Sequence, residues 1–393
     1  MQINILFVDD DIDILNGFKR SMYNLRDKWN GFYASNSADA LKIIQHENVD
    51  VCITDLFIPG ISGSELLRKV KKEYPKTIRV LLSGNPSAKY SVYDYSVAHQ
   101  YLTKPCNIEI IKEKIEIPIL IRSLINNEKT IIKLTGEDGI PSFPEIYYKL
   151  ECEIYSPNVS INRIVNLISK DIGLTAKIFQ LVNSAFFGFP TKIKDLNQAI
   201  NILGLNIIKS IILFTKVFPY LEMSNALKEF IESLWNHSLV VSTISQRLTF
   251  YLTRNRELSE HAYIAGMLHD IGKLIILNMS NQDKTLLNVL DIINNENEIK
   301  KFLGATHSEI GAYALSLWGY PNSIINAVLL HHSTLELNNF NITTAVQISN
   351  RLANIEGIDF SILEKFDSIE SIVELINTKE GNKDEIPGKN PIG

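Results

Sequence analysis

The stretch ILFVDDD at residues 5–11 decides the fold, because four consecutive apolar residues run directly into three acids. A short apolar run of this kind is typical of a strand buried on both faces of a parallel sheet. Further runs of this type recur at Val51–Thr54, Arg79–Ser83 and Gln100–Thr103, separated by segments with helical periodicity. The alternation predicts an α/β fold in which a doubly wound parallel sheet is covered by helices.

Polar side chains follow the four predicted strands. They are, in strand order, Asp9 and Asp10, then Asp55, Ser83 and Lys104. The carboxyl ends of parallel strands form the ligand site of an open sheet, so we expect these side chains to converge. Clustered carboxylates repel one another unless a cation lies among them, and oxygen-only donors suit Mg²⁺. With Mg²⁺ present, one carboxylate can attack phosphorus while the lysine and the hydroxyl contact the phosphoryl group. The alternative is that these acids are solvated loop charges.

The motifs ILFVDDD, TDLFIPGISG, LLSG and YLTKP resemble those of bacterial response regulator receiver domains, over roughly residues 1–120. The resemblance implies a five-stranded, flavodoxin-like parallel sheet, with Asp55 as the residue that a histidine kinase phosphorylates. It also implies a cis bond between Lys104 and Pro105. The other implied roles are Mg²⁺ binding by Asp9, Asp10, Asp55 and the Phe57 carbonyl, and a response to phosphorylation by Ser83, Tyr101 and Lys104.

The second half of the chain shows only helical periodicity. Stripes such as Leu196, Ala199, Ile200 and Leu203 repeat at helical spacing, which predicts an all-helical domain. Helical pattern also runs from residue 108 through 131, interrupted only by Pro118, and turn-forming residues from 135 to 144 mark a domain junction.

Five histidines and one aspartate in this half form a second candidate site. The capping box formed by Thr306 and Glu309 predicts that His307 begins a helix. Imidazoles with a carboxylate suit Zn²⁺, Fe or Mn²⁺, and two such ions bridged by an aspartate would activate water for phosphoester hydrolysis. The alternative is a metal-free core of hydrogen-bonded imidazoles. The candidate ligands are His237, His269, Asp270, His307, His331 and His332, with Asn350 near them in the pattern.

The motifs WNHS, GMLHDIGK, ATHSEIGAYALSLWGYP and LLHH resemble the HD superfamily of metal-dependent phosphohydrolases. Catalytic members carry a further Asp where this chain has Asn350, so Asp270 would be the only anionic ligand and a single metal is expected rather than two. We interpret Lys273 as a helix-end charge. The cyclic-di-GMP phosphodiesterase branch places Gly-Tyr-Pro after its tandem His, whereas here 319–321 precede His331 and are predicted to end a helix.

The segments GIPSFPEIYYKL and SKDIGLTAKIFQLVNSAFFGFPTKIKDLNQAINILG resemble the HDOD domain, a relative without the Gly-Tyr-Pro loop. That resemblance implies a signalling or interaction output rather than hydrolysis. The expected organisation is a receiver domain at 1–120, a helical linker at 121–134, an HDOD domain at 135–355 with its HD-like core at 235–355, a helical extension at 356–378 and a disordered tail at 379–393.

Composition narrows the classes of partner. The net charge is −5 and no dense Lys/Arg cluster is present, which argues against direct nucleic-acid binding. The start lacks a basic signal-peptide region, and the most apolar stretch, 207–218, contains two lysines, so we expect a cytoplasmic protein without a membrane anchor. Cys52, Cys106 and Cys152 are far apart and are expected to be reduced packing residues.

These observations predict a two-component response regulator in which phosphorylation of Asp55 switches an HDOD output, acting on a downstream protein or nucleotide ligand that the sequence does not identify. The segment from Ile110 to Ile132 is the expected conduit and a candidate homodimer contact, with Pro118 as a place to bend. The rival hypothesis is a receiver-gated, metal-dependent phosphohydrolase acting on a nucleotide or cyclic dinucleotide.

Overall fold

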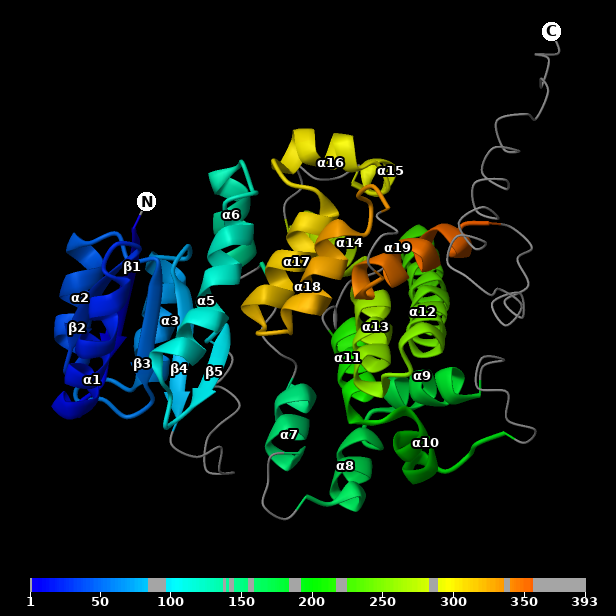
Figure 1. Cartoon of the computed structure of the whole chain (residues 1–393), viewed down its shortest axis with the longest axis horizontal. Coiled ribbons are helices and arrows are strands. Elements are labelled where there is room, and N and C mark those ends of the chain that lie inside the picture. Colours follow the sequence, from blue (N-terminus) through cyan, green and yellow to red (C-terminus); the bar gives the residue numbers. More distant parts are fainter. Residues whose placement is uncertain are drawn as a thin grey trace, which may run out of the picture.

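The computed structural model describes residues 2–83, 97–136, 139–140, 145–154, 159–183, 192–216, 225–282, 289–335 and 340–355. A sheet-containing part (residues 2–122) lies beside an all-helical part (residues 145–355), and one helix connects them (Figure 1). The helical extension and tail expected beyond residue 355, most of the predicted junction at 135–144 and the SAFFGFP segment at 184–190 lie outside the described residues.

Five parallel strands form the sheet, in the order β2-β1-β3-β4-β5. The strands are β1 (Ile3–Val8), β2 (Trp29–Ala34), β3 (Val51–Asp55), β4 (Ile78–Ser83) and β5 (Gln100–Thr103). The helices of this part are α1 (Ile12–Met22), the 3₁₀ helix η1 (Tyr23–Leu25), α2 (Ser37–His46), α3 (Gly63–Glu73) and α5 (Ile108–Arg122). The predicted doubly wound sheet is confirmed.

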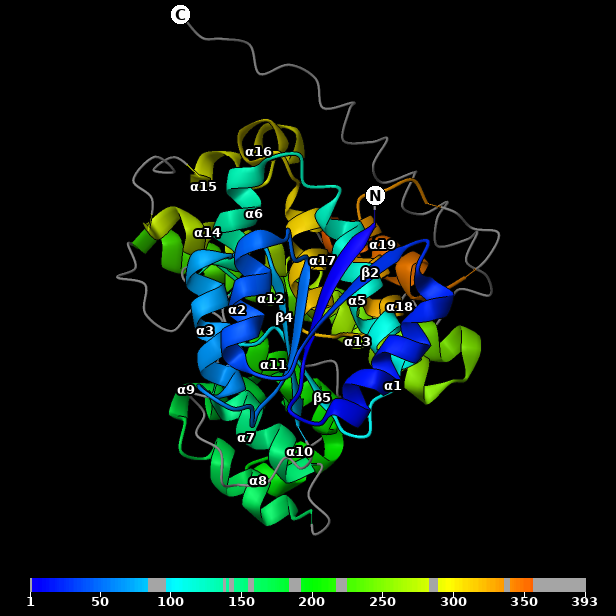
Figure 2. The ribbon, with the colours of Figure 1, turned by 90° about the vertical axis from the view of Figure 1, so that its left-hand side faces the viewer.

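Side chains of the central strands alternate between two apolar layers. Ile5 and Phe7 of β1 pack in one layer with α1 and α5, whereas Leu6 and Val8 pack in the other with α2 and α3. Figure 2 shows α1 and α5 on one side of the strands and α2 and α3 on the other. Helices thus cover both faces, which is why the strands read as continuous apolar runs.

The edge strand β2 was not among the predicted apolar runs. Its sequence, WNGFYA, is interrupted by Asn30 and Gly31, and only its end residues Trp29 and Ala34 are buried. An edge strand pairs on one side only, here with β1, so it tolerates polar residues that a central strand does not. The interruption explains why periodicity alone missed it.

The helical pattern predicted from 108 through 131 has its break at a different place from the expected one at Pro118. The chain leaves α5 at Arg122 and re-enters a helix, α6 (Glu128–Thr135), after Asn127. The Asn127 side chain accepts hydrogen bonds from two backbone N–H groups of the first turn of α6 and so defines the new helix start.

Pro118 lies inside α5 and does not interrupt it. Proline lacks the N–H that would bond the carbonyl four residues earlier, which belongs to Lys114. Gln100 of β5 supplies the missing donor, since its Nε2 lies 3.0 Å from the Lys114 carbonyl oxygen. A side chain from the sheet therefore satisfies the acceptor that proline leaves open.

All elements described after α6 are helices. They are α7 (Glu145–Ile154), α8 (Ile161–Ile168), α9 (Ile172–Val182), α10 (Leu196–Leu203), α11 (Leu205–Lys216), α12 (Asn225–Thr253), α13 (Arg256–Leu268), α14 (Ile271–Gln282), α15 (Val289–Ile292), α16 (Glu296–Leu303), α17 (His307–Leu317), α18 (Asn322–Leu330) and α19 (Ile342–Ala353). The predicted all-helical second half is confirmed for the part of the chain that the structure describes.

Local signals in the sequence explain several of these boundaries. The Thr306–Glu309 capping box is present, with each side chain bonded to the other's backbone N–H, and it begins α17 at His307. Gly319, with φ of 70°, follows directly after the end of α17. The predicted stop signal at 319–321 is thereby confirmed.

Within the described residues, no single helix is long and apolar enough to cross a membrane. The pair Leu196–Leu203 and Leu205–Thr215 meets the length and composition test only when taken together, and it is bent by 104°. The apolar stripe of the first of these two helices is buried in the protein core.

Candidate functional site

The first site lies at the carboxyl ends of the strands, where the sequence predicted it. Asp9, Asp10 and Asp55 each place a carboxylate oxygen within 4.8 Å of the others. Asp9 is buried, Asp55 is half-buried and Asp10 is exposed, so the cluster opens to solvent on one side. The third acid of the motif, Asp11, instead accepts hydrogen bonds from backbone N–H groups at the start of α1.

Lys104 joins two of these acids. Its Nζ lies 2.6 Å from Asp9 Oδ2 and 3.1 Å from Asp55 Oδ1. Burial raises the pKa of Asp9, although its hydrogen bond to Lys104 opposes that shift. Burial lowers the pKa of Lys104, but the hydrogen bonds to the two acids outweigh this effect and raise it. Lys104 is therefore a firmly charged ammonium positioned at the Asp55 carboxylate.

Of the remaining residues predicted for this site, Phe57 and Ser83 lie at or just after the ends of their strands, whereas the Tyr101 hydroxyl is bonded to the segment before β5. Phe57 follows Asp55 by two residues and exposes its side chain. Ser83 ends β4 and pairs with Thr103 of β5, one position beyond the pair of Asp55 with Leu82. The hydroxyl of Tyr101 donates to the Ala98 carbonyl at 3.4 Å. The Lys104–Pro105 peptide bond is cis, as the resemblance implied.

The second site lies in the core of the helical part and consists of two donor groups that share Asp270. One group contains His237, His269 and Asp270, and the other contains Asp270, His307, His331 and His332. Within each group, one ligand atom per residue lies within 4.8 Å of the others. The structure thus brings together all six charged or imidazole residues that the sequence proposed, from helices α12, α17 and the ends of α13 and α18.

Backbone carbonyls fix the orientation of two of the imidazoles. His269 Nδ1 donates to the Gly266 carbonyl at 2.7 Å, and His331 Nδ1 donates to the Val328 carbonyl at 2.7 Å. Each bond commits Nδ1 to a proton and leaves Nε2 as a lone pair directed to the cluster. This is the arrangement in which histidine binds a metal ion.

Three atoms in or beside the cluster lack a hydrogen-bond partner among the described residues. They are His269 Nε2, Asp270 Oδ1 and His307 Nδ1, all buried. His307 Nε2 lies 3.0 Å from Asp270 Oδ1, but without the alignment of a hydrogen bond. His269 Nε2 lies 3.4 Å from Asp270 Oδ2 inside the cluster, whereas His307 Nδ1 faces Glu296. Buried polar atoms are nearly always paired, so the unpaired His269 Nε2 and Asp270 Oδ1 indicate a site built for a ligand that satisfies them.

Burial keeps most of these imidazoles neutral. It lowers the pKa of His237, His269 and His307, and with the neighbouring His331 it lowers the pKa of His332 to about 3. Neutral imidazole is the form that binds metal ions. The donor set therefore fits a divalent transition metal.

Lys273 is part of this site, which corrects its interpretation as a helix-end charge. Its Nζ donates to Asp270 Oδ2 at 2.8 Å, and its side chain is only 12% exposed. Burial opposes ionisation of Asp270, but its interactions with the His269 imidazole and with the Lys273 ammonium outweigh burial, so the pKa of Asp270 lies well below its ordinary value. The spacing of three residues between Asp270 and Lys273 is the sequence feature that could have indicated this contact.

Asn350 and Glu296 border the cluster. His237 Nε2 donates to Asn350 Oδ1 at 3.0 Å, so the amide positions an imidazole and adds no negative charge. Glu296 belongs to no motif described above. Its Oε1 lies 3.6 Å from His307 Nδ1 and accepts a hydrogen bond from Ser308. The fold brings α16 against the start of α17, and the spacing of residues in the sequence does not indicate that Glu296 contacts His307.

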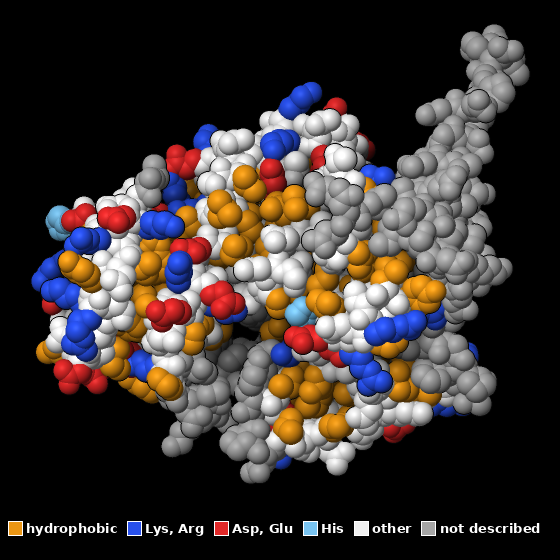
Figure 3. Space-filling model, viewed as in Figure 1, with side chains coloured by type: hydrophobic (Ala, Val, Ile, Leu, Met, Phe, Trp, Pro, Cys, Tyr) orange, Lys and Arg blue, Asp and Glu red, His pale blue; other side chains and the backbone are white. Residues whose placement is uncertain are grey.

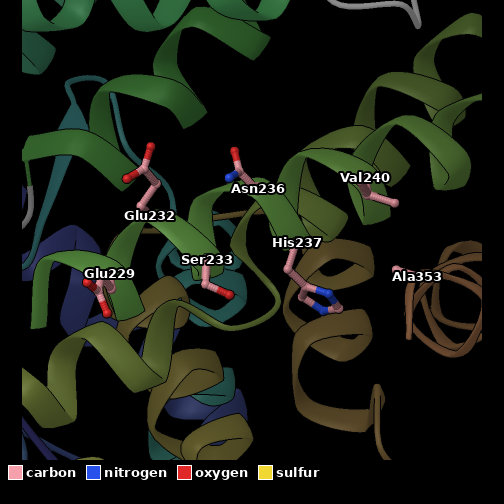
Figure 4. A pocket seen from close by; sticks show the side chains of 7 residues that line it. All are labelled: Glu229, Glu232, Ser233, Asn236, His237, Val240 and Ala353. Carbon is pink, nitrogen blue, oxygen red and sulfur yellow. The ribbon is translucent and has the colours of Figure 1, made fainter. Parts of the chain in front are cut away.

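A cavity of about 600 Å³ opens beside His237 (Figure 4). All of its lining residues come from α12 except Ala353, at the end of α19. Two of them, Glu229 and Glu232, are acidic and none is basic, so the cavity favours cations over phosphates. On the face seen in Figure 3, Lys and Arg side chains are interspersed with Asp and Glu rather than gathered in one patch.

Comparison with known families agrees with this division. The response regulator receiver domain family matches residues 5–116, and the HDOD domain family matches residues 140–334. The chain is 32% identical over 154 residues to the uncharacterized transcriptional regulatory protein YesN of Bacillus subtilis, an alignment that covers 37% of this chain and 40% of that protein. The chain spans only 38% to 43% of the length of the first curated relatives that it matches.

Solved structures resemble the two parts separately. The signal receiver domain of an HD domain-containing protein from Pseudomonas fluorescens is 26% identical, with a TM-score of 0.27, covering 28% of this chain and 89% of that one. An HDOD domain protein with unknown function from Geobacter sulfurreducens is 19% identical, with a TM-score of 0.41, covering 69% of this chain and 90% of that one.

Proposed function

The chain consists of a response regulator receiver domain followed by an HDOD domain, and from this we propose that it is a two-component response regulator whose HDOD output is switched by phosphorylation of Asp55. The donor would be a cognate histidine kinase. The observation that carries this proposal is the ammonium of Lys104 lying 3.1 Å from Asp55 Oδ1 within a cluster of three carboxylates.

The chemistry follows from the residues around Asp55. Asp9, Asp10 and Asp55 supply oxygen donors that suit Mg²⁺, and Mg²⁺ when bound neutralises charge on the phosphoryl group. The Asp55 carboxylate oxygen would attack phosphorus and form an acyl phosphate, while the bond to the leaving group on the donor breaks. Lys104 would then pair with the phosphoryl oxygens that replace the carboxylate oxygen it contacts now.

The test is phosphorylation by acetyl phosphate with Mg²⁺, followed by intact-mass measurement. Wild-type chain should gain one phosphoryl group, and Asp55→Asn should gain none because an amide is not a nucleophile toward phosphorus. Asp13→Asn, an exposed acid of α1 outside the cluster, is the matched control and should be labelled as wild type. Labelling of Asp55→Asn to the wild-type extent would refute the proposal.

A second candidate function, a metal-dependent phosphohydrolase gated by the receiver, is favoured by the orphaned donor atoms around Asp270. His237, His269, Asp270, His307, His331 and His332 would hold a divalent Zn, Fe or Mn ion, which supplies a Lewis acid when bound. Lys273 would hold the Asp270 carboxylate in its ionised form. Two features weigh against turnover of a phosphate ester: Asn350 is neutral where a carboxylate is needed, and the cavity beside His237 is lined by acids.

Metal analysis and a phosphodiesterase assay separate the two candidates. A signalling HDOD domain should release no product from cyclic dinucleotides, with or without Mn²⁺. Asn350→Asp adds a carboxylate beside His237 and should raise Mn²⁺ affinity by about tenfold or more, since it adds a charged donor. Metal-dependent product release by the wild-type chain, lost in His269→Ala and retained in the surface control His46→Ala, would establish the enzyme instead.

A further inference from the structure

Neighbouring atoms decide which ring nitrogen of His307 carries the proton. The Nδ1 of His331 donates its proton to the Val328 carbonyl, so the Nε2 of His331 is a lone pair. That lone pair is hydrogen-bonded to the Nε2 of His307 at 3.4 Å. Two lone pairs cannot form a hydrogen bond, so His307 is the donor and its proton is on Nε2. The Nδ1 of a neutral His307 is therefore a lone pair.

The Nδ1 lone pair of His307 faces a carboxylate. Glu296 Oε1 lies 3.6 Å from His307 Nδ1, and in this tautomer both atoms are hydrogen-bond acceptors. His307 is only 1% exposed, and its Nδ1 has no hydrogen-bond partner in the described part of the chain. A buried acceptor without a donor costs free energy. The arrangement seen here thus places two acceptors against each other, and a proton on Nδ1 would join them.

Local structure holds Glu296 in this position. It is the first residue of α16 and directly follows Asn295, whose side chain caps the helix. Ser308 Oγ donates to Glu296 Oε1 at 2.7 Å, and Ser308 is only 3% exposed. Figure 1 shows α16 above α17, the helix that His307 begins. A separate helix therefore presents the carboxylate to the outer nitrogen of His307.

The inner nitrogen of His307 belongs to a triangle of donor atoms. Its Nε2 lies 3.0 Å from Asp270 Oδ1 and 3.4 Å from His331 Nε2, and these last two atoms are 3.6 Å apart. Ligand atoms at about 2.0–2.1 Å from a tetrahedral Zn²⁺ lie about 3.3–3.4 Å from one another. The triangle therefore has the dimensions of one face of a tetrahedral zinc site. His332 belongs to the same donor group and can supply a fourth ligand.

We propose that Glu296 is a positioning residue for metal binding, which accepts a hydrogen bond from His307 Nδ1 when His307 Nε2 becomes a ligand. The inference rests on the metal site of the second candidate function, and it requires neither turnover nor phosphorylation of Asp55. To become a ligand, Nε2 gives up its proton to water, and Nδ1 takes one up, so the ring stays neutral. The new N–H then points at Glu296, which replaces a contact between two acceptors by a hydrogen bond.

Glu296→Gln separates this role from a merely structural one. The Gln amide can accept from Ser308 and donate to the Nδ1 lone pair of His307, so it suits the metal-free tautomer. Metal-free Glu296→Gln should therefore unfold in urea at the same or a higher midpoint than the wild-type chain. Its Zn²⁺ affinity should fall by about tenfold or more, the range expected for an outer hydrogen-bond partner of a ligating histidine.

The affinity is measured on the full chain, stripped of metal with EDTA and then titrated with Zn²⁺ in competition with a fluorescent zinc indicator. Excess Mg²⁺ is present throughout to occupy the carboxylates of the receiver, which suit that ion. Glu298→Gln is the matched control, because Glu298 is an exposed acid in the first turn of the same helix. Its Zn²⁺ affinity should equal that of the wild-type chain.

Wild-type Zn²⁺ affinity in Glu296→Gln would overturn the inference. A lower affinity accompanied by a lower urea midpoint of the metal-free variant would also overturn it, because Glu296 would then support the fold alone. A wild-type chain that binds no Zn²⁺ would overturn both the inference and the metal site. Phosphorylation of Asp55 is measured separately and would stand in each of these cases.

Nitrogen NMR of the imidazoles tests the tautomer itself, with the His307 signals assigned by their loss in His307→Gln. The His307 proton should be on Nε2 in the metal-free chain and on Nδ1 in the chain loaded with Zn²⁺. A proton already on Nδ1 in the metal-free chain would overturn the inference.

Discussion

Asp270 carries the only carboxylate shared by both donor groups, and Lys273 is the cation that keeps it ionised inside the helical core. Its lowered pKa means that the ionised pair stabilises the fold above the ordinary pKa of an aspartate, and that this stability is lost as pH falls through the folded value. At neutral pH the pair is therefore fully formed.

Lys273→Met should destabilise the chain by about 3 kcal/mol at pH 7, because it leaves a buried carboxylate without its ammonium. Thermal unfolding with and without Mn²⁺ measures the effect, and Mn²⁺ should restore much of the loss by taking the place of the ammonium. Lys300→Met, which removes a more exposed pair with Glu309, is the control and should cost less than about 1 kcal/mol. Equal stability of the two variants would contradict this role for Lys273.

Most residues of the two sites were predictable because they lie in short motifs, many of them at strand and helix ends. The sequence placed Asp9, Asp10 and Asp55 at the ends of buried strands, and parallel topology alone brings such ends together. The role of Lys273 was not predicted, since a lysine three residues after an acid occurs on many exposed helices. Only the burial of both side chains shows that this pair lies in the core.

Among the helices, the contact of α14 with α17 controls the geometry of the cluster. Gly272→Ala should separate these helices and cost about 1–3 kcal/mol, because the added methyl group meets the His307 backbone. Gly173→Ala in α9 is the control, where a Cβ has room and the change should be neutral or slightly stabilising. Urea unfolding measures the free energy of unfolding of both variants. A Gly272→Ala variant as stable as the wild-type chain would show that the helices can move apart freely.

Element boundaries were predictable where a local signal sets them. The capping box before α17 and Gly319 after it gave both of its ends. The break between α5 and α6 was missed because Asn127 outweighs an apolar pattern that continues across it. Pro118 was expected to bend the chain, but Gln100 satisfies the carbonyl that it frees, and that bond comes from another element.

For the whole molecule, α17 covers part of the segment from Ile110 to Ile132 through which we expected two receivers to pair. With α17 seated on Gln100 and Lys114, a second copy cannot use the same atoms. We therefore expect the unphosphorylated chain to sediment as a monomer. The chain treated with Mg²⁺ and beryllofluoride, which mimics the phosphoryl group, should form a dimer. Sedimentation velocity measures both states, and a dimer of equal strength without beryllofluoride would contradict this competition.

The packing of the two domains against each other lay beyond sequence reasoning. Gln100 and Ser316 are 216 residues apart, and neither belongs to a motif that names the other. Amphipathic stripes identify which face of a helix is buried, but they do not identify which surface covers it. The contact of α17 with the receiver was consequently visible only in the assembled structure.

Hydrogen exchange of the full chain, measured by mass spectrometry with and without beryllofluoride and Mg²⁺, tests the central claim most directly. If phosphorylation acts on the HDOD domain through α17, exchange in α17 and at the start of α14 should be faster when beryllofluoride is bound, and Asp55→Asn should show no such change. Exchange that changes only within residues 2–122, with α17 unaffected, would show that the receiver does not act on the HDOD domain through this helix.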